Sequence, residues 1–156
     1  LDLIPYFLRI DTNMNISSGY PLKWACQKGL VNIAESFIIR GAKIDNNNNE
    51  ALRIASKLGN YDLIKLLLNY GADPHIDDEF PLVIACTKGK NKIVRLLLQR
   101  KFNVDIHINN DTPLMKAAEN GHVNVVKTLL KKGANKNVVK LENIKRYPKI
   151  INLLTS

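Results

Sequence analysis

Histidine and cysteine, the residues found most often in metal sites and as nucleophiles, are scarce in this chain. The three histidines are His75, His107 and His122. Acidic residues that could join the first two in binding a divalent cation lie nearby, at Asp73, Asp77, Asp78 and Asp105. The spacing of these groups matches no known ligand pattern for zinc or calcium. We therefore expect no metal site and no cofactor.

Catalytic motifs are missing from the sequence as well. It contains no glycine-rich phosphate loop after a strand and no nucleophile elbow. Cys26 and Cys86 occupy the same position in two copies of a repeated segment, about 20 Å apart if the copies stack at helix-packing distance, which is too far for a disulfide. We interpret both as reduced, buried residues and not as nucleophiles. The sequence thus predicts a protein that is not an enzyme and is intracellular, either cytoplasmic or nuclear.

The repeated segment determines the elements that carry these residues. Its four copies read PLKWACQKG at 21–29, ALRIASKLG at 51–59, PLVIACTKG at 81–89 and PLMKAAENG at 113–121. Three columns are constant: leucine at 22, 52, 82 and 114, alanine at 25, 55, 85 and 117, and glycine at 29, 59, 89 and 121. A fixed period of this kind is typical of stacked repeats.

Two helices are predicted in each repeat. In the first helix the leucine and the alanine are three positions apart, so both face the same buried side. Pro21, Pro81 and Pro113 stand at the start of this helix, where a missing N–H is tolerated, and the glycine column ends it. The second helix has apolar residues three and four positions apart, for example at 63, 64, 67 and 68.

This pattern resembles the ankyrin repeat. Repeat four is most similar to the family motif, with Thr-Pro-Leu at 112–114, Gly-His at 121–122 and Gly-Ala-Asn at 133–135. The resemblance implies an all-α fold, an ankyrin-repeat solenoid of stacked antiparallel helix pairs with shortened β-hairpin connections. The histidine that the family carries after the leucine is replaced in every copy, by Lys23, Arg53, Val83 and Met115. The short repeats are similar to those of ankyrin proteins of large DNA viruses of amoebae.

The connections account for the short period. Successive leucines of the column are 30, 30 and 32 residues apart, whereas the family period is about 33. We expect the missing residues to come from the β-hairpins, which should be shortened between the first three repeats and nearly complete before the fourth. In repeat three, Lys101-Phe102-Asn103 stands where Gly-Ala-Asp is expected.

We predict a single domain over residues 1–156. Its full repeats are expected at 17–46, 47–76, 77–108 and 109–138. Residues 1–16 are interpreted as a partial N-terminal repeat with a second helix at 2–10. Residues 139–156 are interpreted as a truncated capping repeat, with a short first helix from 141 and a final helix around 150–154. No run of about 18 apolar residues occurs, so no membrane span is expected.

The formal net charge of +9 comes from the C-terminal half, because residues 88–156 hold 15 basic and 4 acidic residues. We interpret this basicity first as a solvated surface. Binding of nucleic acid or of an acidic partner through this half is the alternative. Nucleic-acid binding lacks one feature that it needs, since Phe102 and Tyr147 alone do not form a stacking platform for bases.

Stacked repeats offer a concave face made of first helices and turn tips, and the resemblance implies that partner contacts lie there. Trp24 on the first helix is interpreted as core or cover and not as a binding anchor. We predict a monomeric, non-catalytic scaffold that recognises a protein partner of unknown identity, or alternatively the targeting segment of a larger adaptor or enzyme. The candidate contact residues, taken by column, are Lys23, Gln27, Lys28, Arg53, Lys57, Leu58, Glu79, Val83, Thr87, Lys88, Asp111, Met115, Glu119 and Asn120.

Overall fold

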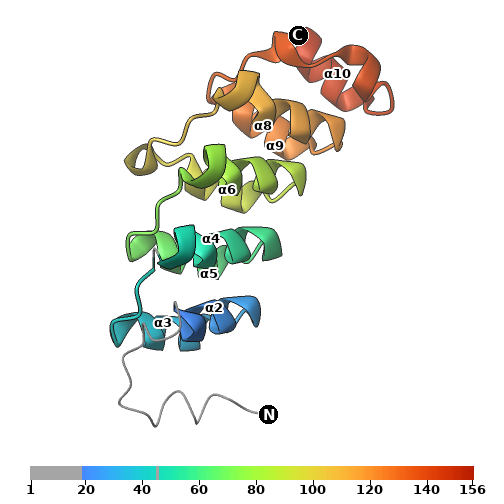
Figure 1. Cartoon of the computed structure of the whole chain (residues 1–156). Coiled ribbons are helices and arrows are strands. Elements are labelled where there is room, and N and C mark those ends of the chain that lie inside the picture. Colours follow the sequence, from blue (N-terminus) through green and yellow to red (C-terminus); the bar gives the residue numbers. More distant parts are fainter. Residues whose placement is uncertain (1–18, 45) are drawn as a thin grey trace. The chain divides into compact units, whose positions relative to one another are not determined.

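The computed structural model describes residues 19–44 and 46–156, and every regular element in these ranges is helical (Figure 1). The described residues divide into two compact units on either side of the Asp73–Pro74 bond. Unit 1 contains α2 (Tyr20–Gln27), α3 (Val31–Ile39), α4 (Asn46–Leu58) and α5 (Tyr61–Asn69). Unit 2 contains α6 (Ile76–Thr87), α7 (Asn91–Leu97), η1 (Arg100–Phe102), α8 (Ile108–Glu119), α9 (Val123–Lys131), η2 (Lys136–Val138), η3 (Leu141–Ile144) and α10 (Pro148–Thr155).

The predicted all-α class and the helix pairs are confirmed. In unit 1, α2 packs on α3 and α4 packs on α5, while α2 also lies beside α4 and α3 beside α5. Unit 2 repeats this arrangement with α6 and α7 against α8 and α9, and α10 packs on α9. Each unit therefore has a layer of first helices and a layer of second helices. The helix expected at 2–10 lies outside the described residues, and the single domain over 1–156 stays a prediction.

The constant leucine and alanine columns form the core. The leucines at 22, 52, 82 and 114 are at most 2% exposed, and the alanines at 25, 55, 85 and 117 are at most 3% exposed. Because an alanine side chain is a single methyl group, neighbouring first helices approach closely at that column. The second helices bury their own apolar residues in the core of their unit, at 63, 64 and 67 in α5 and at 93, 94 and 97 in α7.

The first helices end in one recurring hydrogen-bond pattern. At the end of α6, the backbone N–H of Gly89 donates to the Cys86 carbonyl (3.2 Å), and that of Lys90 donates to the Ala85 carbonyl (2.9 Å). This pair of bonds is the Schellman motif, which requires a left-handed residue between the helix and the next segment. Gly89 supplies it with φ 67°. The predicted glycine caps are confirmed.

In the described residues the connections are short, and none of them is a β-hairpin. No strand occurs in residues 19–44 or 46–156. In unit 2, three consecutive residues near the start of each first helix are left-handed and form a kink there: Asp77–Glu79 in α6 with φ from 45° to 59°, and Asn109–Asp111 in α8 with φ from 48° to 59°. Asp and Asn adopt this conformation more readily than most residues with a side chain. The expectation of a nearly complete hairpin before repeat four is therefore wrong.

The two extra residues of repeat three lie after its second helix. Helix α7 ends at Leu97, and the 3₁₀ turn η1 follows before the chain reaches Asn103. Asn103 is left-handed with φ 49°, the conformation that a glycine takes after the second helices of repeats one, two and four. The insertion thus preserves the turn while replacing its glycine.

The capping repeat at 139–156 stays a prediction, and the structure places two helical elements in this segment. Its short first element is η3 and its final helix is α10, with Ile144 and Ile150 fully buried. The Tyr147 ring between these elements lies against Gly121, where an added Cβ would come within 2.5 Å of the ring. The cap therefore closes on the end of α8 through aromatic contact.

Candidate partner-binding surfaces

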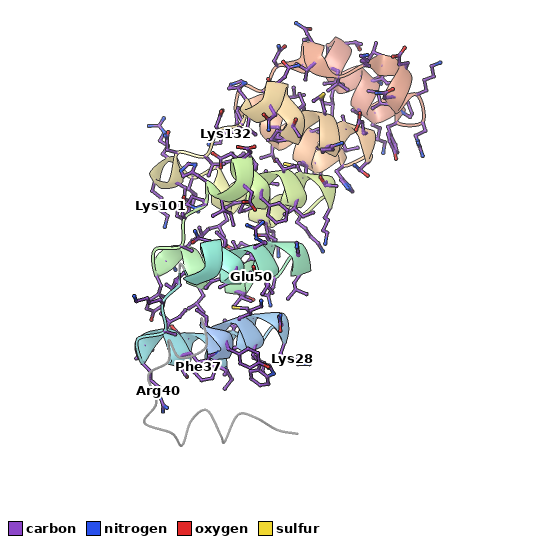
Figure 2. The ribbon with its side chains drawn as sticks, in the orientation of Figure 1. Lys28, Phe37, Arg40, Glu50, Lys101 and Lys132 are labelled. Atoms are coloured by element: carbon purple, nitrogen blue, oxygen red, sulfur yellow. The ribbon has the colours of Figure 1, made fainter. Side chains whose placement is uncertain are left out.

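In unit 1, the candidate residues occupy the adjoining ends of α2 and α4. Gln27 and Lys28 lie at the end of α2, and Lys57 and Leu58 lie at the end of α4; all four side chains are exposed (Figure 2, where Lys28 is labelled). Leu58 is 52% exposed. An apolar side chain therefore stands among long polar ones at these helix ends.

The rest of the unit 1 candidates lie one turn back on the same helices. Lys23 on α2 and Arg53 on α4 are half-buried. The Lys23 Nζ lies 3.5 Å from the Glu50 Oε1, so an ion pair links α2 to α4. Trp24 is half-buried, which agrees with a covering role on α2.

In unit 2, the corresponding surface is formed by the ends of α6 and α8. Lys88 and Asn120 are exposed at these ends, whereas the other candidates are half-buried, at positions 83, 87, 115 and 119. The Glu119 carboxylate is already engaged, since it lies 3.7 Å from the Lys116 Nζ and accepts from the Asn143 side chain at 3.4 Å. This surface is consequently more neutral than that of unit 1.

The two acidic candidates at the turn tips do not face the solvent. Asp111 is 4% exposed and Glu79 is 5% exposed. Asp111 Oδ1 accepts from the backbone N–H of Asn135 at 2.9 Å and lies 3.1 Å from His107 Nδ1. Both carboxylates are held inside their left-handed turns, so we leave them out of the surface proposed below.

Glu79 repeats the arrangement of Asp111 one repeat earlier. Its Oε1 accepts from the backbone N–H of Asp105 at 3.2 Å and lies 2.7 Å from His75 Nδ1. Its Oε2 is buried with no hydrogen-bond partner among the described residues. Each carboxylate thus ties its own turn to the next connection along the chain. Sequence reasoning missed these pairs, although the four-residue spacing from histidine to acid was visible in both repeats.

The histidines consequently have structural contacts. His122 Nε2 lies 2.9 Å from the Thr87 carbonyl oxygen, which joins the start of α9 to the end of α6. His122 therefore connects two neighbouring repeats, and its side chain makes no capping bond to its own helix. Among the described residues, no group of three or more His, Cys, Asp and Glu side chains is placed to hold a metal ion.

The two cysteines are buried and free in the structure. Burial raises the pKa of the Cys26 thiol to about 12, and burial also raises the pKa of Cys86. Both thiols are therefore protonated at neutral pH, which is unfavourable for a nucleophile.

Comparison with known proteins identifies the repeats. The family description "Ankyrin repeats (3 copies)" matches residues 1–78 and again residues 75–140. The chain belongs to the ankyrin-repeat family. The resemblance seen in the sequence is thereby confirmed, and ankyrin repeats generally mediate protein–protein interaction without catalysis.

Two curated ankyrin-repeat proteins are similar to parts of this chain. An ankyrin repeat-containing protein of Treponema pallidum (strain Nichols) is 29% identical over 113 residues, which is 66% of this chain and 38% of that protein. An ankyrin repeat protein of Acanthamoeba polyphaga mimivirus is 32% identical over 65 residues, which is 42% of this chain and 14% of that protein. The chain matches well under half the length of each. None of the helices in the described ranges has the length and apolar character needed to cross a membrane.

Proposed function

We propose that this ankyrin-repeat chain binds a protein partner through the ends of its first helices, and that it catalyses no reaction itself. The observation that carries the proposal is Leu58, which is 52% exposed at the end of α4. Lys57 precedes it in the chain, and Lys28 is exposed at the end of α2, the first helix that packs on α4. Burial of a leucine side chain stabilises a complex by about 1 to 2 kcal/mol, and long cationic side chains around it can add specificity.

Fixed packing positions and variable surface positions alternate on the first helices. The leucine and alanine columns keep one residue type in all four repeats because the core requires it. The two positions at the end of each first helix change from Gln-Lys at 27–28 to Lys-Leu at 57–58 and Glu-Asn at 119–120. Such variation on a constant frame is what a recognition surface needs, since each repeat can contribute different chemistry.

The test compares two double variants that make the same chemical changes. Lys28→Glu with Leu58→Ser alters the first-helix surface of unit 1. Lys65→Glu with Ile39→Ser alters exposed residues of α5 and α3 in the same unit, and Ile39 is 69% exposed. The tagged proteins are used for affinity capture from cells that contain the protein, with far-UV circular dichroism to check folding.

We expect the affinity of the first-helix variant for its specific partner to fall by about tenfold or more, because an apolar anchor is removed and a charge is reversed. The second-helix variant should retain that partner at the wild-type level. Equal retention by both variants would exclude the first-helix surface of unit 1 as the binding site.

A further inference from the structure

Basic residues are concentrated around the second helices of unit 2. Residues 88–104, which include α7 and η1, contain six Lys and Arg residues and no Asp or Glu. Residues 120–141, which include α9 and η2, contain five Lys residues and no Asp or Glu. Lys88 lies at the end of α6 and belongs to the first-helix surface of unit 2. The other basic residues of these two segments lie on α7 and α9 or on the residues that flank these helices.

A groove of about 580 Å³ lies between these two helices. Arg95 lines it from α7, and Lys131 and Lys132 line it from the end of α9. All three side chains are exposed, and none of them forms an ion pair with the part of the chain that the structure describes. Three cations thus share one concave space without an acidic residue to balance them.

Hydrogen bonds fix the two walls of the groove to each other. The Thr128 hydroxyl on α9 donates to the Asn91 side-chain oxygen on α7 at 2.8 Å. The Lys132 ammonium donates to the Leu98 carbonyl at the end of α7 at 3.3 Å, where the helix dipole favours a positive charge. Because the wall positions are set before a ligand arrives, less ordering is needed on binding.

We propose that this groove docks an acidic peptide segment of a partner protein. Carboxylates complement the three cations, and the aliphatic stems of Arg95 and Lys131 give a peptide apolar contact. A nucleic-acid strand is the less suitable ligand, since no aromatic residue lines the groove and bases have nothing to stack on. The groove is a second binding site, separate from the first-helix surface and not dependent on it.

The probe is a fluorescein-labelled peptide of alternating glutamate and leucine, titrated with the whole chain and followed by fluorescence anisotropy at about 50 mM NaCl. The groove variant carries Arg95→Gln, Lys131→Gln and Lys132→Gln. The control carries Lys136→Gln, Lys140→Gln and Lys145→Gln, which remove the same charge from exposed positions outside the groove. Circular dichroism melts establish that both variants are folded.

We expect the dissociation constant of the groove variant to be about tenfold higher, because the variant loses the binding free energy of three partly screened charge contacts. The control should change the dissociation constant by less than about threefold. The corresponding glutamine–leucine peptide should not bind. In the wild-type chain, the glutamate peptide should shift backbone amide NMR signals of α7 and α9 and leave those of α6 and α8 in place, a result that needs no variant to fold.

Three outcomes would overturn the proposal. Equal weakening by both variants would mean that only the overall charge matters. Absence of saturable binding of the glutamate peptide would show that the groove accepts no acidic segment. Tighter binding of a duplex DNA of about 20 base pairs, lost in the groove variant but not in the control, would assign the groove to nucleic acid.

Discussion

Replacement of Gly89 by alanine tests how one repeat is joined to the next. Gly89 follows α6 in the left-handed conformation, with φ 67°, and its α-carbon faces the His122 ring of the next repeat. A Cβ at position 89 would lie 2.5 Å from His122 Nδ1 and 2.8 Å from two ring carbons. The methyl group would therefore strain the backbone and also displace the imidazole.

The two costs can be separated. A non-glycine residue in the left-handed region costs about 1 to 2 kcal/mol. Displacement of His122 breaks its 2.9 Å contact with the Thr87 carbonyl, and the loss of one such hydrogen bond costs about 1 kcal/mol. Gly89→Ala should therefore lower the free energy of unfolding by about 2 to 3 kcal/mol.

Gly133→Ala is the matched control in the same unit. Gly133 also has a positive φ, of 98°, but nothing lies within 4 Å of its added Cβ. This variant should show only the backbone cost of about 1 to 2 kcal/mol. The assay is urea unfolding followed by far-UV circular dichroism, with the free energy taken from linear extrapolation.

A double-mutant cycle with His122→Ala isolates the contact between the repeats. With the imidazole removed, Gly89→Ala should cost no more than the backbone term, which gives a coupling free energy of about 1 kcal/mol. If Gly89→Ala costs the same with and without the ring, the steric contact plays no part and the reasoning is refuted.

Two further predictions concern the buried polar groups. Asp111→Ala should destabilise the protein by about 2 to 3 kcal/mol, because the backbone N–H of Asn135 loses its acceptor. Asp111→Asn keeps an acceptor and tolerates φ 56°, so it should cost less than about 1 kcal/mol. Equal melting temperatures for the two variants would contradict this prediction. Cys26 and Cys86, whose pKa values burial raises, should not react with Ellman's reagent at about pH 8 until the chain is denatured. Above the ordinary thiol pKa of about 8.5 the unfolded chain releases both protons while the folded chain keeps them, so the free energy of unfolding should fall as the pH rises toward 12. A chain carrying Cys26→Ala and Cys86→Ala should lack that part of the decline.

The core could be predicted from the sequence because packing imposes the same residue on every repeat. Leu52 and Ala55 recur in register with their counterparts, and only a buried, closely packed position explains a constant leucine and a constant small residue. The caps were predictable for a related reason, since a helix that ends in a Schellman motif needs a left-handed residue and glycine supplies it at the lowest cost.

The connections could not be predicted in the same way. A run of three polar residues indicates a turn in any fold, and such runs occur at Asp77-Asp78-Glu79 and Asn109-Asn110-Asp111. In both runs the direction of the last side chain depends on three successive left-handed residues. A polar residue at a turn is ordinarily exposed, so Glu79 and Asp111 were expected at the surface. Their burial follows from tertiary hydrogen bonds to the next connection, which lies more than 20 residues ahead.

The basic groove also could not be predicted from the sequence. The excess of Lys and Arg after residue 88 was visible, and so was their spread around two helices. Whether Arg95 and Lys131 line one space depends on how α7 and α9 pack together, and helix periodicity alone does not give that contact.

The central claim, that the ends of the first helices recognise a protein partner, is tested most directly by site-specific photo-crosslinking in cells that contain the protein. Benzoylphenylalanine is placed at position 58, at the end of α4, and in a matched chain at position 39, at the end of α3, since both native side chains are large, apolar and exposed. We predict a discrete protein adduct from position 58 and none from position 39. The same adducts from both positions, or an adduct from position 39 alone, would contradict the claim.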